Sequence, residues 1–203
     1  MVTKRFLAAV LMVLPILLSA QEVSVDEALF RKGDDPAWSA FSYDDNAWRK
    51  VSFDRPWEEL GLDQVNGMGW YRLHVVIPSS LKKGKVSAIL LDMGAIDDSD
   101  ETWVNGYRVG KTGTFPEDPG GYSSEWGKRR YYVVDPGWVR WDQDNLIAVR
   151  VYNYGDPGGF YRGAVRIVKP GLKDFATLSL VAETGGYKAV LATSVKTAGT
   201  LQI

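Results

Sequence analysis

The chain has 203 residues, among which 24 Lys and Arg nearly balance 25 Asp and Glu, so its formal net charge is −1. Both signs are interspersed along the sequence, and the absence of a basic stripe excludes a nucleic-acid-binding protein. The absence of cysteine excludes a disulfide framework, a thiolate nucleophile and a cysteine-ligated metal.

The N-terminal residues 1–20 have the layout of a secretory signal peptide. Lys4 and Arg5 precede an apolar run over residues 6–18, and Ser19 and Ala20 supply small side chains for a cleavage site. The run is short for a membrane span, although an uncleaved signal anchor begins in the same way. No cysteine follows the run, which excludes a lipid-anchored lipoprotein. We therefore expect a secreted or periplasmic protein that has no contact with a membrane after cleavage.

Beyond residue 20, apolar side chains recur with a period of two residues, which predicts strands rather than helices. The expected strands cover residues 71–77, 86–93, 131–134, 146–152 and 164–168. The segment 86–93 is apolar on both faces, as a central strand covered on each side would be. Glycine, proline, asparagine and aspartate interrupt these runs at short intervals, which is typical of an antiparallel sandwich. With only 25–31 and a turn near 57–60 as helical candidates, the sequence predicts an all-β protein.

The stretch 90–113 joins an apolar run to a group of acids and then to a tight turn. The acids follow one another closely: Asp97, Asp98, Asp100 and Glu101. Asn105 and Gly106 lie between two segments that contain apolar residues, and they tolerate the positive φ that both central residues of a type I′ turn need. We therefore expect a buried strand, an acidic loop and a tight hairpin, which place these carboxylates and Trp103 at one end of a sheet.

Two further segments differ from this pattern of short strands and turns. Residues 111–130 form a long polar loop rich in glycine and proline, and loops of that length are usually functional or disordered. The Lys-Pro-Gly sequence at 169–171 predicts a boundary. Beyond it, 175–183 and 187–195 are β-prone runs that predict a hairpin. Residues 170–203 are expected either to complete the sandwich with this extra hairpin or to begin a truncated second domain.

A series of short motifs runs in order through residues 34–168. The motifs are Asp44-Asp45-x-x-Trp48, Pro56-Trp57-Glu58, Gly69-Trp70-Tyr71-Arg72, Val104-Asn105-Gly106, Arg130-Tyr131-Tyr132-x-Val134, NLIAVRV at 145–151 and GGFYRG at 158–163. Together they resemble the sugar-binding jelly-roll domain of glycoside hydrolase family 2 enzymes and of sialate O-acetylesterase-like proteins. The resemblance implies an antiparallel jelly-roll β-sandwich of the galactose-binding-like type over 21–169, usually attached to a catalytic domain. It ends near Val168, which favours a second domain in 170–203.

The resemblance also implies that the acidic loop, the loop 111–130 and a turn at 159–162 meet at one end of the sandwich. Sugar rings present apolar C–H faces that stack on aromatic side chains, while charged and amide groups bind the hydroxyls. The expected carbohydrate-binding residues are Asp98, Asp100, Glu101, Trp103, Trp126, Arg130, Tyr161 and Arg162. Three more aromatic residues near strand ends are wider candidates: Trp70, Tyr154 and Phe160. The remaining tryptophans are assigned to the core and its rim: Trp38, Trp48, Trp57, Trp138 and Trp141.

Other chemistry is open to the same residues. A pair of the acids could catalyse glycoside hydrolysis, but catalytic carboxylates face each other across a substrate at ~5–10 Å, usually from two strands. Calcium is an alternative ligand for them, although the spacing of an EF-hand is absent. His74 is the single histidine and the chain has no Gly-x-Ser-x-Gly motif, so we expect His74 to be an outward or half-buried sheet residue. The sequence thus predicts no catalytic residue, no metal site and no cofactor.

These observations predict an exported, non-catalytic carbohydrate-binding module related to accessory domains of glycan-degrading hydrolases. Its expected partners are a carbohydrate ligand and a catalytic hydrolase domain or subunit. One alternative is a fragment or small member of the glycoside hydrolases or sialate O-acetylesterases, which would act on glycosides or sugar acetyl esters. A second alternative is a structural module without a ligand.

Overall fold

The computed structural model describes residues 22–53, 55–62, 66–82, 88–155, 157–169, 176–183 and 186–193. The predicted signal peptide, residues 1–20, lies outside the described residues. Among the helices of the described part, none has the length and apolar character needed to cross a membrane.

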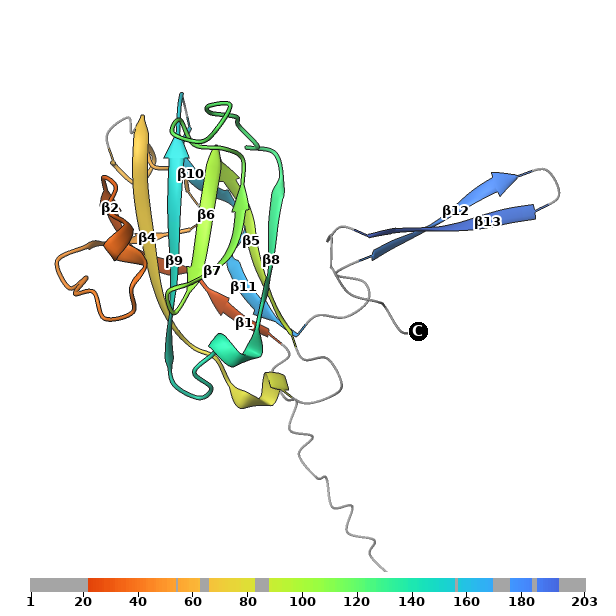
Figure 1. Ribbon diagram of the computed structural model, residues 1–203, viewed down its shortest axis with the longest axis horizontal. Helices are drawn as coiled ribbons and strands as arrows, with labels where there is room; N and C mark the ends of the chain where they lie inside the picture. Colours follow the sequence, from red (N-terminus) through yellow and green to blue (C-terminus); the bar gives the residue numbers. More distant parts are fainter. Residues whose placement is uncertain are drawn as a thin grey trace, which may run out of the picture.

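Two antiparallel sheets form a sandwich (Figure 1). The six-stranded sheet has the order β3 (Arg49–Ser52), β2 (Glu27–Lys32), β4 (Gly67–Val76), β9 (Asp144–Asn153), β6 (Ser99–Val104) and β7 (Tyr107–Thr112). The five-stranded sheet has the order β1 (Glu22–Val25), β11 (Val165–Val168), β5 (Ile89–Asp97) and β10 (Gly159–Arg162), with β8 (Arg129–Val134) also paired to β5. The predicted all-β jelly-roll sandwich is confirmed.

The main core lies between the sheets and follows the period of two residues. On β4 it receives Tyr71, Leu73 and Val75, and on β9 it receives alternate residues in the same way. Strand β5 is buried on both faces from Ile89 to Ile96, as expected for a central strand. Trp57 is also fully buried here, as predicted.

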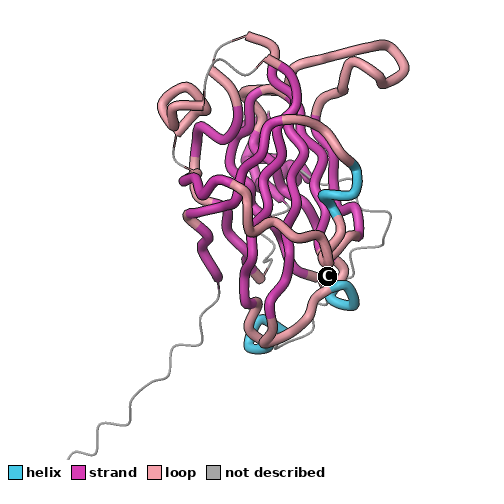
Figure 2. The backbone as a smooth tube through the Cα atoms, turned by 90° about the vertical axis from the view of Figure 1, so that its left-hand side faces the viewer, coloured by secondary structure: helices cyan, strands magenta, loops and turns pink. Residues whose placement is uncertain are grey.

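The helical prediction for residues 25–31 is wrong, because the segment contains the end of β1 and most of β2. Ala28 and Phe30 point into the main core, and the backbone of β2 pairs with β3 and β4. Burial of alternate residues therefore favours a strand over a helix. The three helices of the described part are single 3₁₀ turns in connections: η1 (Pro36–Ser39), η2 (Ser79–Lys82) and η3 (Pro136–Trp138) (Figure 2). The predicted turn near 57–60 is confirmed by the hydrogen bond from the Leu60 amide to the Pro56 carbonyl, at 3.2 Å.

A second, smaller cluster covers the outer face of the six-stranded sheet. It contains Trp38, Trp48, Trp70, Leu146 and Ala148. We call the segment 33–48, which supplies the first two tryptophans, the outer flap. The flap is held by the buried guanidinium of Arg72, which donates to the Asp45 carboxylate at 2.6 Å and to the carbonyls of Trp38, Ala40 and Tyr43. His74 lies beside Arg72 with 37% of its side chain exposed, which confirms a half-buried sheet residue.

The C-terminal strands β12 (Ala176–Glu183) and β13 (Gly186–Thr193) form a two-stranded sheet of their own (Figure 1). They pair antiparallel with each other over their full lengths. The predicted pairing of 175–183 with 187–195 is therefore confirmed in the described residues, while the assignment of 170–203 to a second domain stays a prediction.

Candidate functional site

The chain changes from one sheet to the other within a single residue. Strand β5 ends at Asp97 and β6 begins at Ser99, so Asp98 alone forms the corner. Its backbone amide donates to the Tyr152 carbonyl at the end of β9, at 3.1 Å. The prediction of an acidic loop here is therefore wrong, because the acids belong to two strands and a corner. Since side chains alternate along a strand, these acids point to different faces of the sheet.

Asp100 and Arg130 are buried together inside the sandwich. Arg130 Nε donates to the Asp100 carboxylate at 2.9 Å, and Tyr132 donates to the same carboxylate at 2.7 Å. The other nitrogens of Arg130 bond the carbonyls of Glu125 and Asp98 at 2.8 Å each and that of Lys128. Both side chains are 0% exposed. The expectation that they contact a ligand is therefore wrong, because their hydrogen bonds are already used within the protein.

Glu101 and Trp103 lie on the outer face of the six-stranded sheet, away from the corner. Glu101 forms an ion pair with Arg108 at 2.9 Å. The Trp103 ring stacks on Trp70, with centroids 5.1 Å apart and planes at 16°. Trp70 is itself fully buried, as is Phe160 in the main core. Trp70 and Phe160 are therefore core residues rather than ligand residues at strand ends. Glu101 and Trp103 lie away from the corner, and a ligand role for them stays a prediction.

A hollow of about 290 Å³ opens at the corner, and we call it the end hollow. Its lining residues are Asp97, Asp98, Trp126, Asn153, Tyr154, Gly155 and Pro157. Trp126 is 57% exposed and Tyr154 is 68% exposed, so both rings are open to solvent beside the carboxyl groups.

Two further predicted residues lie next to the end hollow. Tyr161 donates from its hydroxyl to the Trp126 carbonyl at 2.7 Å, and the two rings are 6.4 Å apart. The Arg162 guanidinium lies 5.7 Å from the Tyr161 ring centre. The structure thus brings Asp98, Trp126 and Tyr161 together from the corner, the long loop and strand β10, while Arg162 contacts Tyr161 and does not line the hollow. The expected turn at 159–162 is this short strand.

The long loop is ordered by its own hydrogen bonds and covers 113–128, between β7 and β8. Thr114 and Ser123 form a two-way bridge at 3.1 and 3.2 Å. Asp118 accepts from the Lys111 ammonium at 2.5 Å and from the Phe115 amide at 2.6 Å, and the Phe115 ring is buried. This anchoring fixes the second half of the loop, which carries Trp126, against the corner.

The Asp98 carboxylate is held by donors from the loop and from β9. It accepts from the Ser124 hydroxyl and from the Tyr154 amide, the latter at 2.9 Å. Burial alone would raise the pKa of Asp98, but hydrogen bonds from Asp97, Ser124 and Tyr122 lower it below the ordinary value. Asp98 is therefore ionised and is committed to protein donors.

Asp97 also lines the end hollow, and its carboxyl group changes protonation state near neutral pH. Burial raises its pKa to about 7, and the hydrogen bond and negative charge of Asp98 add to the effect. Near neutral pH the pair carries one proton, which Asp97 donates to Asp98, so Asp97 presents its remaining acceptor oxygen to a ligand. Two carboxyl groups in hydrogen-bond contact lie closer than the ~5 Å separation in retaining glycosidases or the ~6.5–9.5 Å in inverting ones.

Comparisons with known proteins now bear on this arrangement. No family model and no curated protein sequence matches the chain. Among solved structures, a glycosyl hydrolase family 2 member from Bacteroides cellulosilyticus has 25% sequence identity and a TM-score of 0.60 over 80% of this chain and 23% of its own. The chain is a domain related to glycoside hydrolase family 2. The predicted resemblance is thereby confirmed.

Two β-glucuronidases show the same fold. The enzyme from Bacteroides uniformis has 23% identity and a TM-score of 0.59 over 79% of this chain and 20% of its own. The enzyme from Ruminococcus gnavus has 13% identity and a TM-score of 0.57 over 85% of this chain and 34% of its own. The domain therefore spans 20–34% of the length of these family 2 enzymes.

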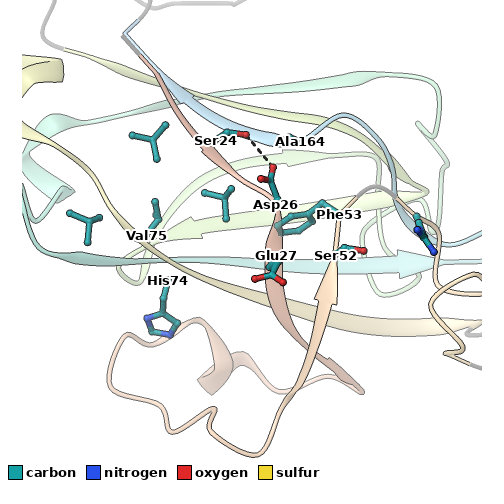
Figure 3. A pocket seen from close by; sticks show the side chains of 12 residues that line it. Ser24, Asp26, Glu27, Ser52, Phe53, His74, Val75 and Ala164 are labelled. Atoms are coloured by element: carbon teal, nitrogen blue, oxygen red, sulfur yellow. Dashed lines mark hydrogen bonds between the residues drawn. The ribbon is translucent and has the colours of Figure 1, made fainter. Parts of the chain in front are cut away.

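A larger hollow of about 930 Å³ opens on the side of the domain, between β1 and β2 and the ends of β3 and β4 (Figure 3). We call it the side groove. Its carboxylates have partners: Asp26 accepts from Ser24 at 3.3 Å, and Glu27 pairs with Lys50 at 2.5 Å. The Phe53 ring that lines it is only 1% exposed and offers no open face for stacking. The end hollow, with two open aromatic rings, is the better candidate site of the domain.

The calcium alternative lacks a converging set of ligands. Asp100 points inward to Arg130 and Glu101 points outward to Arg108, so the acids of the corner do not face one point. Among the described residues, no group of three or more histidines or acids is arranged to hold a metal ion.

Asp97, Tyr122 and Asn153 belong to this site but are absent from the residues expected to bind carbohydrate. Asp97 stands in the acidic run, and its place as the last residue of a buried strand is the signal that could have identified it. Asn153 is the last residue of β9, next to the wider candidate Tyr154. For Tyr122, one polar aromatic among many in a long loop, the sequence carries no such signal.

Proposed function

We propose that this domain is an exported, non-catalytic carbohydrate-binding module that accompanies a glycan-degrading hydrolase. The observation that carries the proposal is the end hollow, where the open rings of Trp126 and Tyr154 flank the Asp97–Asp98 carboxyl pair. Aromatic faces stack on the C–H faces of a sugar, and a carboxyl group such as that of Asp97 can accept a hydrogen bond from a hydroxyl group.

The comparisons support a hydrolase as the partner. The similar solved structures are glycoside hydrolases of which this domain matches only a part. A module with this fold would therefore act beside a catalytic domain, in the same chain or in another subunit. Export rests on the signal-peptide layout of residues 1–20, and N-terminal sequencing of the exported protein should begin at or near Gln21.

Binding should be measured by calorimetric titration of the purified mature chain against galactosides, rhamnosides and sialosides. We expect a dissociation constant of about micromolar to millimolar, because a small polar ligand buries little area and loses hydration. Trp126→Ala should weaken binding by about 1 kcal/mol or more. The control is Tyr107→Ala, which removes a ring that is 52% exposed at the β6–β7 turn. If every sugar fails at high millimolar concentration, the domain is a structural module.

The non-catalytic part of the proposal is tested by turnover. The hydrogen-bonded Asp97–Asp98 pair lacks the spacing of glycosidase carboxylates. The purified domain should therefore release no product from aryl glycosides or aryl acetates above buffer. Activity that disappears in Asp97→Asn while the fold survives would establish the enzyme alternative.

A further inference from the structure

Charge in the end hollow is one-sided. Of its described lining residues, the ones with ionisable side chains are the carboxylic acids Asp97 and Asp98 and the phenol Tyr154. The negative charge of Glu58 also acts on Asp97. An anion that enters the hollow would therefore meet like charges over a short distance.

The nearby cations offer no positive charge to a ligand in the end hollow. Arg130 lies behind the corner with its side chain 0% exposed, and its nitrogens bond Asp100 and three backbone carbonyls. Arg162 lies over the Tyr161 ring and is not among the residues that line the hollow. Sites that recognise a carboxylate usually present a free guanidinium fork or several N–H donors to it. The described lining of the end hollow has no such fork.

We propose that the end hollow selects uncharged sugars and rejects uronic and sialic acids. This inference rests on the function proposed above and specifies its ligand class. The Asp97 carboxyl group would accept from a hydroxyl group of a neutral pyranose, while Trp126 and Tyr154 cover the apolar face of the sugar and Asp98 supplies a fixed negative charge behind Asp97. A ligand carboxylate in the same position would face Asp98, and above neutral pH it would also face an ionised Asp97.

The protonation of Asp97 gives the selectivity a pH dependence. Asp98 and Glu58 oppose the ionisation of Asp97, and the charge of Arg130 favours it. The phenols of Tyr122 and Tyr161 also interact with Asp97. The proton is lost as the pH rises through about 7, so the hollow gains negative charge between pH 5.5 and 8.5. Discrimination against an anionic sugar should therefore increase over this interval.

The test uses probes that differ only at C6: methyl β-galactoside against methyl β-galacturonide, and methyl β-glucoside against methyl β-glucuronide. Calorimetric titrations are made at pH 5.5 and 8.5 and at low salt, where charge effects are largest. At pH 8.5 we expect each neutral probe that binds to bind at least about tenfold more tightly than its uronide. At pH 5.5 the ratio should be smaller.

Two variants locate the effect. Asp97→Asn keeps the shape of the side chain and removes its charge, so it should make the ratio independent of pH, and its fold is checked by circular dichroism. Glu27→Gln removes a carboxylate from the side groove and should change neither affinity nor ratio. If Glu27→Gln alters sugar binding and Asp97→Asn does not, the ligand occupies the side groove and the inference is wrong.

The remaining outcomes separate this inference from the proposed function. Uronides that bind as tightly as the neutral probes would overturn the charge selectivity and leave carbohydrate binding intact. Failure of all probes, neutral and acidic, at high millimolar concentration would overturn both.

Discussion

Asp100 and Arg130 have a structural role, although charged residues of these types suggested ligand binding. They are 30 positions apart in sequence, and the pairing exists only because β6 and β8 come together in the fold. Sequence patterns report local neighbours, so the charged groups near the corner were read as ligands. Burial of the pair, with both side chains 0% exposed, could not be deduced from their positions in the chain.

The buried pair leads to a prediction about stability. Arg130→Met should destabilise the domain by about 3–5 kcal/mol, because it leaves the Asp100 carboxylate buried without its countercharge. The double variant Arg130→Met with Asp100→Leu should recover part of this loss, since it removes both charges but leaves the carbonyls of Glu125, Lys128 and Asp98 without the Arg130 donors. Urea unfolding measures both. A single variant that loses less than about 1 kcal/mol would mean that water reaches the pair.

Asp97 leads to a prediction in which removal of a charge stabilises the fold. Its folded-state pKa of about 7 lies above its ordinary value of 3.8, so the folded protein binds more protons than the unfolded one between these two pH values. Stability contributed by protonated Asp97 is therefore lost as the pH rises through about 7. Asp97→Asn, whose amide can still donate to Asp98, should raise the melting temperature more at pH 8 than at pH 5. An equal change at both pH values would contradict the raised pKa.

At the scale of elements, regular strands and the tight turn were predictable and the corner was not. Strands such as β4 and β9 expose their period of two residues directly in the sequence. The β6–β7 turn was also visible, because Asn105 and Gly106 both have the positive φ that their residue types favour, at 51° and 87°. The corner at Asp98 lies in a run of aspartate and serine, residue types that are frequent in turns and loops, so a single-residue change of sheet was mistaken for a loop.

The β6–β7 turn offers a test of backbone strain without side-chain clashes. A Cβ added at Gly106 would meet no atom closer than the Ser39 carbonyl at 4.0 Å. Gly106→Val should therefore lose about 1 kcal/mol or more through its positive φ alone. The matched control is Gly106→Asn, which tolerates this φ and should lose less. Denaturant unfolding compares the two, and equal losses would refute backbone strain as the cause.

The outer flap is held partly by an ionisable residue, His74. Its ring contacts the Asp144 carboxylate at 2.7 Å and the Asp45 carboxylate at 3.0 Å. Burial opposes protonation of the ring, but the hydrogen bonds and charges of these two acids raise its pKa above the ordinary 6.5. The protonated ring therefore stabilises the fold below pH ~6.5, and this contribution is lost as the pH rises through the folded-state pKa.

The test compares how the free energy of unfolding depends on pH in the wild type and in His74→Gln. Urea unfolding of the wild type and of His74→Gln from pH 5.5 to 9 should show the largest loss on substitution at the acidic end, with the two profiles converging as the pH rises. Taking the difference removes the separate contribution of Asp97, which titrates in an overlapping range. Parallel profiles would mean that the histidine does not hold the flap through its charge.

At the scale of the whole molecule, the sandwich was predictable because many weak motifs occurred in a consistent order. Its strand order depends on contacts between distant segments, such as β1 with β11, and these leave no local pattern. The end hollow has the same origin, since the ends of β5 and β9 and the long loop meet only after both sheets have formed. This is why Asp98 and Trp126 could be named from the sequence, while Asp97 was left out and the buried Asp100 was included.

The C-terminal hairpin should be separable from the sandwich. In the described residues β12 and β13 form backbone hydrogen bonds only with each other. Ending the chain after Lys169 should therefore leave the melting temperature and the near-UV circular dichroism of the sandwich unchanged. A lower melting temperature would show that the hairpin completes the sandwich rather than beginning another domain.

Asp98 is the point at which separate parts of the molecule are tied to one another. Its amide bonds the Tyr152 carbonyl, its own carbonyl accepts from the Glu125 amide, and its carboxylate accepts from Ser124 and Tyr154. The corner, the end of β9 and the long loop consequently cannot move independently around the end hollow. Because the walls are already fixed in place, little conformational entropy of the protein remains to be lost on association. The unfavourable entropy of binding a sugar there would fall on the ligand and its hydration shell.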